Sequence, residues 1–366
     1  MKTEKQILRH YFSPKANPNG DGAAKRSAQI SEILQKYNIN NKRFDLIDRP
    51  QIHYSHYLKA IIFCKKNKMK MRFNKKKLIK LTSEINYAQN FLATNKTQNQ
   101  LFLWESSREW YYFLPYIFKN LSIPIIALPH NIESLVPSQK SFYSEKESPY
   151  WFSEEIQHLK QANVVFTISR EEQLFLQLHG LESYYLPYYP TFEVTKNLLQ
   201  IRENRKTSSK DFFLLLGSAY NPPTFFGMKA VIELFQTQNM NQKLIVAGYG
   251  SDRLQHSIKQ ESIELKGAVG NEILTNLLNH AKAIIINQPA TTGSLTKIPE
   301  LLIAGIPIIA NSFSLRSFHN IGGIYSFENI SQIENLLKIE HSIPEIPKKE
   351  PIFEEIFIQK ILSFSK

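Results

Sequence analysis

The sequence has few of the residues that would place it in several large classes of protein. Its 366 residues include one cysteine, Cys64, which excludes a disulfide framework and a metal site built from several cysteines. No apolar run approaches the roughly 18 residues that a membrane-spanning helix needs. The first residues, MKTEKQILRHYF, contain no apolar segment of the kind found in a secretory signal. We therefore expect a soluble protein of the cytoplasm.

Acidic residues are missing from one segment of the chain. The formal net charge is +13, but Arg49–Ser83 holds eleven Lys or Arg residues and no Asp or Glu. The rest of the chain has 34 basic against 32 acidic residues, a net charge of +2. A nucleic-acid-binding protein that is basic over its whole surface is therefore not indicated.

What is present is typical of a globular protein with more than one core. Apolar residues make up 42% of the chain and aromatic residues 12%, which excludes extensive disorder. A chain of this length usually forms two domains.

Short apolar segments alternate with segments of helical length, a pattern typical of a parallel sheet with helices on both faces. The conformation of the basic segment 58–81 stays open, because its MKMRF core alternates as a strand does while its flanks suit helices. We expect strands at 7–12, 44–48, 101–104, 124–128, 164–168, 184–186, 212–216, 243–247, 263–266, 283–287 and 307–310, and helices at 24–37, 109–120, 150–161, 171–179, 227–236, 272–281, 297–304 and 353–365.

Two prolines, Pro187 and Pro190, and then a polar and basic stretch interrupt this alternation, and we interpret residues 191–210 as a linker. It would separate an N-terminal domain, residues 1–190, from a C-terminal domain, residues 211–349. Two α/β domains of similar size imply a ligand site in a cleft between the carboxyl ends of their sheets.

The segment from Thr291 to Ala310 is the most informative for function. A buried strand leads into a Thr/Gly/Ser loop that opens a helix, where free backbone N–H groups and Lys297 could hold a diphosphate. Glu300, one turn later, could accept hydrogen bonds from two ribose hydroxyls. An ordinary capped helix with a surface Lys–Glu pair would explain the same residues.

The spacing Gly293, Lys297, Glu300, followed by LLIAGIPIIA, resembles the nucleotide-sugar-binding segment of GT-B glycosyltransferases, especially family 4. Five further motifs resemble that family and fall in its order along the chain. They are the glycine loop of 12–26, LPHNIE at 128–133, VFTISREE at 165–172, LGSAYNPP at 216–223 and VAGYG at 246–250.

The resemblance implies a GT-B architecture, in which two Rossmann-like α/β domains face each other across a cleft and a C-terminal helix, 350–366, packs back on the N-terminal domain. It implies transfer of a sugar from a nucleotide-sugar to a glycan or lipid-linked acceptor, in the synthesis of cell-surface polysaccharide, lipopolysaccharide or glycolipid. The anomeric configuration would be retained, with no bound metal and no cofactor.

The resemblance also implies roles for individual residues. Lys297 would hold the donor diphosphate together with the backbone of Gly293 and Ser294, and Glu300 would bind the ribose. His130 would be the catalytic residue that faces the donor sugar. Gly217 and Gly248 would form walls of the nucleotide pocket, and Gly20, Asp21 and Gly22 would form a loop close to donor and acceptor.

Two departures from the family leave a catalytically silent partner subunit as an alternative. Thr292 stands where the family commonly has a glutamate that binds the donor sugar. The loop that opens the C-terminal domain, Asn221–Thr224, lacks the family's usual basic residue.

The basic segment is expected to dock on an anionic membrane surface, at the inner face of the cell membrane, where a lipid-linked acceptor would lie. A basic nucleic-acid-binding protein remains an alternative, but it leaves the diphosphate and ribose pattern unexplained, so we expect no nucleic acid partner. The expected membrane-facing cations are Lys65, Lys66, Lys68, Lys70, Arg72, Lys75, Lys76 and Lys77, with Ile61, Ile62, Phe63, Met69, Met71 and Phe73 as apolar contacts.

Overall fold

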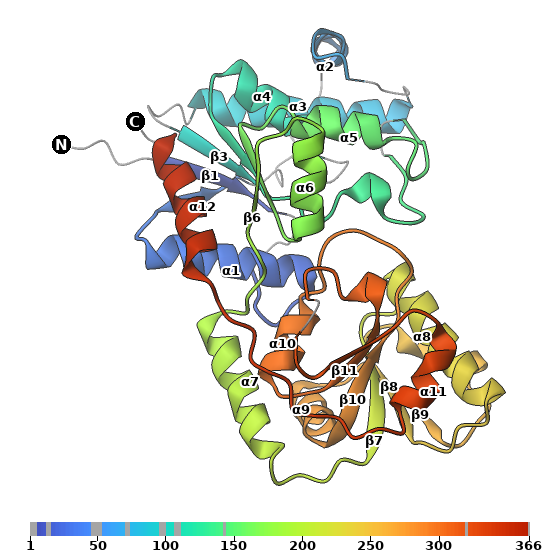
Figure 1. The fold of residues 1–366 in the computed structure, drawn as a ribbon. Coiled ribbons are helices and arrows are strands. Elements are labelled where there is room, and N and C mark those ends of the chain that lie inside the picture. Colours follow the sequence, from blue (N-terminus) through green and yellow to red (C-terminus); the bar gives the residue numbers. More distant parts are fainter. Residues whose placement is uncertain are drawn as a thin grey trace. The chain divides into compact units, whose positions relative to one another are not determined.

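Two parallel six-stranded sheets, each in its own unit of the chain, organise the computed structural model (Figure 1). One unit comprises Met1–Pro187 and Glu350–Lys366, and the other comprises Tyr188–Lys349. The structure describes residues 6–11, 16–44, 53–69, 74–94, 100–105, 111–141, 144–318 and 321–364.

The N-terminal sheet has the strand order β2-β1-β3-β4-β5-β6. The chain leaves β1 toward β2 and then returns to β3 on the other side, so the topological switch point lies between β1 and β3, which pair directly. The strands are β1 (Gln6–His10), β2 (Asn41–Arg43), β3 (Gln100–Trp104), β4 (Ile125–Ala127), β5 (Val164–Thr167) and β6 (Ser183–Tyr185).

Successive side chains of these strands enter two different cores. Ile7 and Leu101 belong to one, while Leu8 and Phe102 belong to the other. On the first face lie α1 (Gly22–Lys36) and α12 (Pro351–Ser363), which are far apart in sequence (Figure 1). The second face is covered by α2 (Tyr54–Lys66), α3 (Lys75–Thr94), α4 (Leu114–Asn120), α5 (Phe152–Leu159) and α6 (Arg170–Leu178).

The C-terminal sheet has the order β12-β11-β10-β7-β8-β9, with its switch point between β7 and β10. Helices α7 (Phe192–Asn204), α9 (Asn271–His280) and α10 (Lys297–Ile303) pack on one face, and α8 (Pro222–Thr237) and α11 (Ile333–Leu336) on the other. The strands are β7 (Phe212–Leu216), β8 (Leu244–Ala247), β9 (Ile263–Gly267), β10 (Ala281–Ile286), β11 (Ile308–Asn311) and β12 (Ile324–Phe327).

The predicted linker at 191–210 is wrong, because most of it forms α7. Val194 and Ile201 are buried at helical spacing, and Ile201 joins the core beneath α9 and α10. Arg202 Nη1 donates to the carbonyl oxygen of Leu302 at 2.8 Å, and Arg205 Nε donates to that of Gly305 at 3.0 Å. The basic residues that suggested a solvated linker thus bind the carbonyl groups at the end of α10.

The basic segment forms two helices, α2 and α3, in its described parts. Phe63 and Met69 are each only 8% exposed and lie in the core, so the prediction that they face a membrane is wrong. The reason is the helical period: Ala60, Phe63 and Cys64 share the inner face of α2. Residues 70–73, with Met71 and Phe73, lie outside the described residues, as do residues 45–48 of the expected second strand.

Two buried histidines should make the fold sensitive to acid. Burial lowers the pKa of His158 to about 3, and burial together with Arg43 lowers the pKa of His10 to about 3. Both are neutral in the folded chain but take up protons near pH 6.5 when it unfolds. The free energy of unfolding should therefore fall as the pH drops from 6.5 toward 3, by up to about 1.4 kcal/mol per pH unit for each histidine.

Urea denaturation at several pH values measures this slope. In the variant His158→Gln, the free energy of unfolding should fall less steeply with decreasing pH, by up to about 1.4 kcal/mol per pH unit, because one titrating histidine is gone. An equal slope in the variant and the unchanged protein would mean that His158 is not buried as a neutral ring.

Candidate functional site

The switch point of the C-terminal sheet brings together three of the predicted donor-binding residues. Lys297, the first residue of α10, donates from Nζ to the carbonyl oxygen of Leu216 at 3.0 Å, where β7 ends. Gly248 follows β8 with φ of +126°, and a Cβ atom there would lie 2.1 Å from the carbonyl oxygen of Gly217. Only glycine fits this close approach, so the ends of β7 and β8 and the ammonium of Lys297 share one small region.

Helix α8 approaches the same region closely. A Cβ atom on Gly227 would lie 1.5 Å from the carbonyl oxygen of Asn287, the residue that follows β10. The helix can therefore sit directly against the backbone that leads from β10 into the Thr/Gly/Ser loop. No local sequence motif singles out Gly227.

The Thr/Gly/Ser loop is held by an arginine that the sequence analysis missed. Arg316 follows β11 and donates from Nε to the carbonyl oxygen of Gly293 at 2.9 Å and from Nη2 to that of Thr292 at 3.3 Å. Ser294 is half-buried in this loop, two residues before the N-cap of α10 at Thr296. Arg316 thus adds a second cation close to the predicted diphosphate residues.

Glu300 is a buried residue, only 9% exposed, and not part of a surface Lys–Glu pair. Its Oε1 accepts a hydrogen bond of 2.7 Å from the hydroxyl of Tyr188, which is also buried. Tyr188 is the first residue of the C-terminal unit and lies 112 positions away in sequence, so no local pattern indicates it.

A third cation reaches the loop that follows β7. Arg253 is exposed and donates from Nη1 to the carbonyl oxygen of Ala219 at 2.9 Å, with its guanidinium 4.8 Å from the centre of the Phe225 ring. Asn221–Thr224, expected as a loop, form the N-cap and first turn of α8 and include no basic residue, but Arg253 of η3 (Ser251–Ser257) lies beside them.

In the N-terminal unit, His130 is half-buried in the segment that follows β4. Glu133 in the same segment is buried, and it accepts hydrogen bonds from Asn131 Nδ2 at 3.3 Å and from Gln139 Nε2 at 3.0 Å. The segment continues into a single turn, η2 (Glu133–Leu135).

The glycine loop after β1 is described from residue 16 onward. Asp21 is the N-cap of α1 and accepts a 2.9 Å hydrogen bond from the backbone N–H of Ala24. Gly22 is the first residue of that helix, and a Cβ atom on Gly20 would lie 2.7 Å from the Cβ of Ala24. Helix capping accounts for Asp21 without a ligand.

A buried ion pair lies at the switch point of the N-terminal sheet, between β1 and β3. Arg9 in β1 pairs with Glu105, which directly follows β3, and both side chains are almost fully buried. Ser27 of α1 donates from Oγ to Glu105 Oε2 at 2.7 Å, and its carbonyl oxygen accepts from Arg9 Nη2 at 2.6 Å. These bonds connect β1, β3 and α1 just below the glycine loop.

The predicted basic patch is partly exposed. Lys77 departs from the prediction, because its ammonium pairs with Glu145 at 2.6 Å and its side chain is only 16% exposed. Lys70 and Arg72 lie outside the described residues. The exposed members are Lys65, Lys66, Lys68, Lys75 and Lys76.

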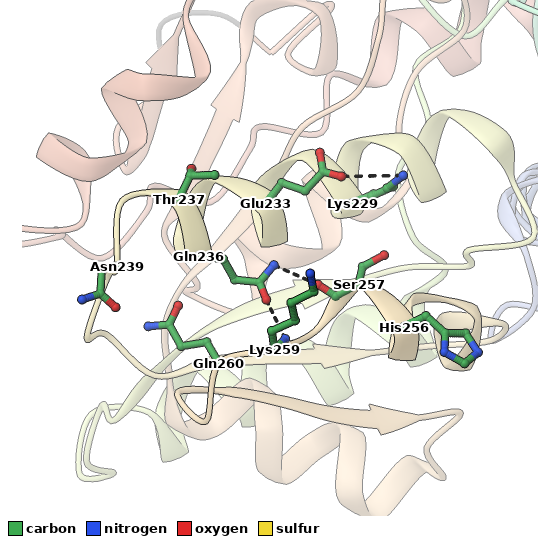
Figure 2. Close-up of a pocket in the computed structure, with 9 residues that line it drawn as sticks. All are labelled: Lys229, Glu233, Gln236, Thr237, Asn239, His256, Ser257, Lys259 and Gln260. Atoms are coloured by element: carbon green, nitrogen blue, oxygen red, sulfur yellow. Dashed lines mark hydrogen bonds and ion pairs between the residues drawn. The ribbon is translucent and has the colours of Figure 1, made fainter.

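A polar hollow of about 670 Å³ lies elsewhere in the C-terminal unit, beside the second half of α8 (Figure 2). Its side chains bind their own neighbours: Gln236 Nε2 donates to the carbonyl oxygen of Ser257 at 2.8 Å and Gln236 Oε1 accepts from the N–H of Lys259 at 2.6 Å. None of the predicted donor-binding residues lines it. The lining residues are Lys229, Glu233, Gln236, Thr237, Asn239, His256, Ser257, Lys259 and Gln260.

The described residues contain neither a metal-binding cluster nor a membrane-spanning helix. No three His, Cys, Asp or Glu side chains in these ranges are placed to hold a metal ion. No helix in the same part of the chain is long and apolar enough to cross a membrane.

The hydrogen bond between Tyr188 and Glu300 leads to a prediction for nucleotide binding. The variant Tyr188→Phe removes one donor to the carboxylate, so we expect nucleotide affinity to fall about fivefold, which corresponds to about 1 kcal/mol. Isothermal titration calorimetry measures the change, with Tyr189→Phe as the matched control. Equal affinities in the two variants would show that Tyr188 does not orient Glu300 for a ligand.

Comparisons with known proteins show the fold. No family model matches the sequence, and no curated protein matches it. The structure is similar to that of an α,α-trehalose-phosphate synthase (UDP-forming) from Burkholderia vietnamiensis, with 10% identity, 99% of each chain covered and a TM-score of 0.60. Sucrose-phosphate synthase from Thermosynechococcus elongatus matches with 13% identity, 99% of this chain and 95% of that chain covered, and a TM-score of 0.58.

A third similar structure has a different activity in its name. It is the UDP-GlcNAc 2-epimerase from Methanocaldococcus jannaschii, with 12% identity, 98% of this chain and 99% of that chain covered, and a TM-score of 0.53. Sheet order, helix placement and these near-complete alignments agree with the prediction from the sequence motifs. The chain therefore has the two-domain α/β fold of the GT-B glycosyltransferases.

Proposed function

We propose that this protein transfers a sugar from a nucleotide-sugar donor to a glycan or lipid-linked acceptor. The observation that carries the proposal is the meeting of Lys297, Gly217 and Gly248 at the switch point of the C-terminal sheet. Ligands of open α/β sheets bind at such points, outside the carboxyl ends of the strands.

The donor diphosphate would bind at Lys297, whose ammonium would move from the Leu216 carbonyl oxygen to the phosphate oxygens. Arg316 and Arg253 would supply further positive charge from the neighbouring loops. Glu300, oriented by Tyr188, would accept hydrogen bonds from the ribose hydroxyls. With cations in these positions, the leaving diphosphate would be stabilised by protein groups, in keeping with a metal-independent reaction. Retention of the anomeric configuration is proposed from the family resemblance alone.

His130 is the proposed catalytic residue. Its segment follows β4 of the N-terminal sheet, and the family resemblance implies a role near the reacting sugar. A catalytically silent subunit is the alternative, because Thr292 offers a sugar one neutral hydroxyl oxygen where a carboxylate would offer two charged oxygens.

A turnover assay tests the function. The protein is incubated with a panel of nucleotide-sugars, with and without glycan and lipid-linked acceptors, and the released nucleotide is quantified by chromatography. We expect release from one donor, stimulated by one acceptor. Nucleotide binding without release would indicate the silent subunit, and recovery of an epimerised nucleotide-sugar would indicate the activity named for one of the similar structures.

We also propose that α2 docks the protein on an anionic membrane surface, where a lipid-linked acceptor would be found. Tyr54, Leu58 and Ile62 are 94%, 61% and 56% exposed on this helix. Exposed Lys65 and Lys66 lie at its C-terminal end. Apolar side chains beside a row of cations match the headgroup boundary of an anionic leaflet.

Removing the cations should release the protein from vesicles. Each Lys near an anionic leaflet contributes about 1 kcal/mol, so the triple variant K65Q/K66Q/K68Q should bind on the order of a hundredfold more weakly. Co-sedimentation with anionic and neutral vesicles at rising salt measures the effect, and K206Q/K259Q/K338Q in the C-terminal unit is the matched control. Equal binding to neutral vesicles, or equal loss in the control, would rule out docking through α2.

A further inference from the structure

Two glutamates from neighbouring helices hold the backbone of the segment that contains His130. Glu172 of α6 accepts the backbone N–H of Ile132 at its Oε1, at 2.8 Å. Glu155 of α5 accepts the N–H of Glu133 at Oε1 and the N–H of Ser134 at Oε2, each at 2.8 Å. Three consecutive N–H groups of one segment are thus bound by carboxyl groups from two helices.

These contacts replace secondary structure that the segment lacks. Strand β4 ends at Ala127, and the one helical turn among residues 128–141, η2, has three residues. Glu155 and Glu172 are 1% and 4% exposed, so the bonds are shielded from water. A buried N–H that loses its acceptor costs about 1–3 kcal/mol, so the two carboxyl groups dictate the backbone path just after His130.

We propose that Glu155 and Glu172 are positioning residues for sugar transfer, because they fix the segment that presents His130 to the donor sugar. The inference rests on the proposed function of His130 for its catalytic part. Its structural part, the holding of residues 132–134, stands on the hydrogen bonds alone.

The two glutamates should respond differently to replacement by glutamine. Both oxygens of Glu155 face a backbone N–H, so the amide nitrogen of Glu155→Gln must oppose one of these donors. Burial raises the pKa of Glu155 to about 8. The expected effect of Glu155→Gln does not depend on the protonation state, because each carboxyl oxygen faces a backbone N–H whether or not the group is charged. Glu172 Oε2 is bound by the hydroxyl of Ser169, which can reverse its role, so Glu172→Gln keeps an oxygen for Ile132.

The kinetic test compares these variants. We expect Glu155→Gln to lower kcat at least about tenfold and Glu172→Gln to keep it within about threefold, with nucleotide affinity within twofold in both. The double variant H130A/E155Q should be no slower than H130A alone, because Glu155 acts through His130. Additive losses in the double variant would overturn the proposal.

Amide hydrogen exchange of the peptide that contains residues 130–135 gives a readout independent of activity. Exchange should be at least about tenfold faster in Glu155→Gln than in Glu172→Gln. If the protein turns over no nucleotide-sugar, the proposed function fails while this difference still tests the holding of the segment. Should Glu155→Gln not fold, Glu172→Ala takes its place, since it removes the acceptor of the Ile132 N–H. If amide exchange of this peptide in Glu155→Gln, or in Glu172→Ala where that variant replaces it, equals exchange in the unchanged protein, the inference is contradicted.

Discussion

Replacing His130 with alanine is expected to slow sugar transfer at least about a hundredfold while nucleotide affinity stays within about twofold. The reason is the separation of roles between the two units: His130 follows β4 of the N-terminal sheet, whereas the proposed nucleotide residues follow β7, β8 and β10 of the C-terminal sheet. Loss of one group aimed at charge that develops in the transition state typically costs about 10²–10³ in turnover. Steady-state kinetics and calorimetry on the same preparation measure both quantities.

The control for this variant is His179→Ala, which removes an exposed histidine of the same unit at the end of α6. It should leave turnover and nucleotide affinity unchanged. A His130→Ala variant that kept a third or more of its turnover would show that the chemistry depends on other groups. A large loss of nucleotide affinity would instead place His130 in the nucleotide pocket.

Replacing Lys297 with alanine is expected to weaken nucleotide diphosphate binding by about ten- to a hundredfold. The ammonium lies at the end of β7, and a charge-assisted hydrogen bond to phosphate contributes roughly 1.5–3 kcal/mol. Glu300→Ala should cause a loss of similar size, because it removes the carboxylate proposed to bind the ribose. Calorimetric titration with nucleoside diphosphates measures both.

The two variants can be distinguished with a ligand that has no phosphate. Lys297→Ala should leave the affinity for a nucleoside unchanged, whereas Glu300→Ala should lower it. The matched control is Lys229→Ala in α8, a lysine that pairs with Glu233 at 3.6 Å on the polar hollow of Figure 2. If both variants bound diphosphates as the unchanged protein does, the donor site would lie elsewhere.

Most of the strands were predictable because buried parallel strands appear in the sequence as short, continuous apolar runs. Phe212–Leu216 and residues 283–286 are examples, and both belong to central strands. The edge strands β2, expected at 44–48 but formed by the polar Asn41–Arg43, and β12 were not predicted. Helix α7 was not predictable in the same way, because Arg202 and Arg205 find their partners about a hundred residues further along the chain. A polar sequence therefore looked like a linker, although it docks on α10.

The candidate site was predictable only where its residues share one local motif. Lys297 and Glu300 belong to one helix and stand at the family's spacing. Four other residues contact the candidate regions only through tertiary structure, and no spacing along the chain indicates their partners. They are Tyr188, Arg253, Arg316 and Glu155. The interpretation of α2 failed in part because the helical period directs Phe63 into the core, whereas the sequence left the conformation of segment 58–81 open.

The most direct test of the central claim is a crystal structure of the protein with the nucleoside diphosphate that it binds most tightly. We expect the diphosphate beside Lys297 at the ends of β7 and β8, with the ribose hydroxyls on Glu300. A nucleotide bound in the polar hollow beside α8, or anywhere else away from the β7–β10 switch point, would contradict it.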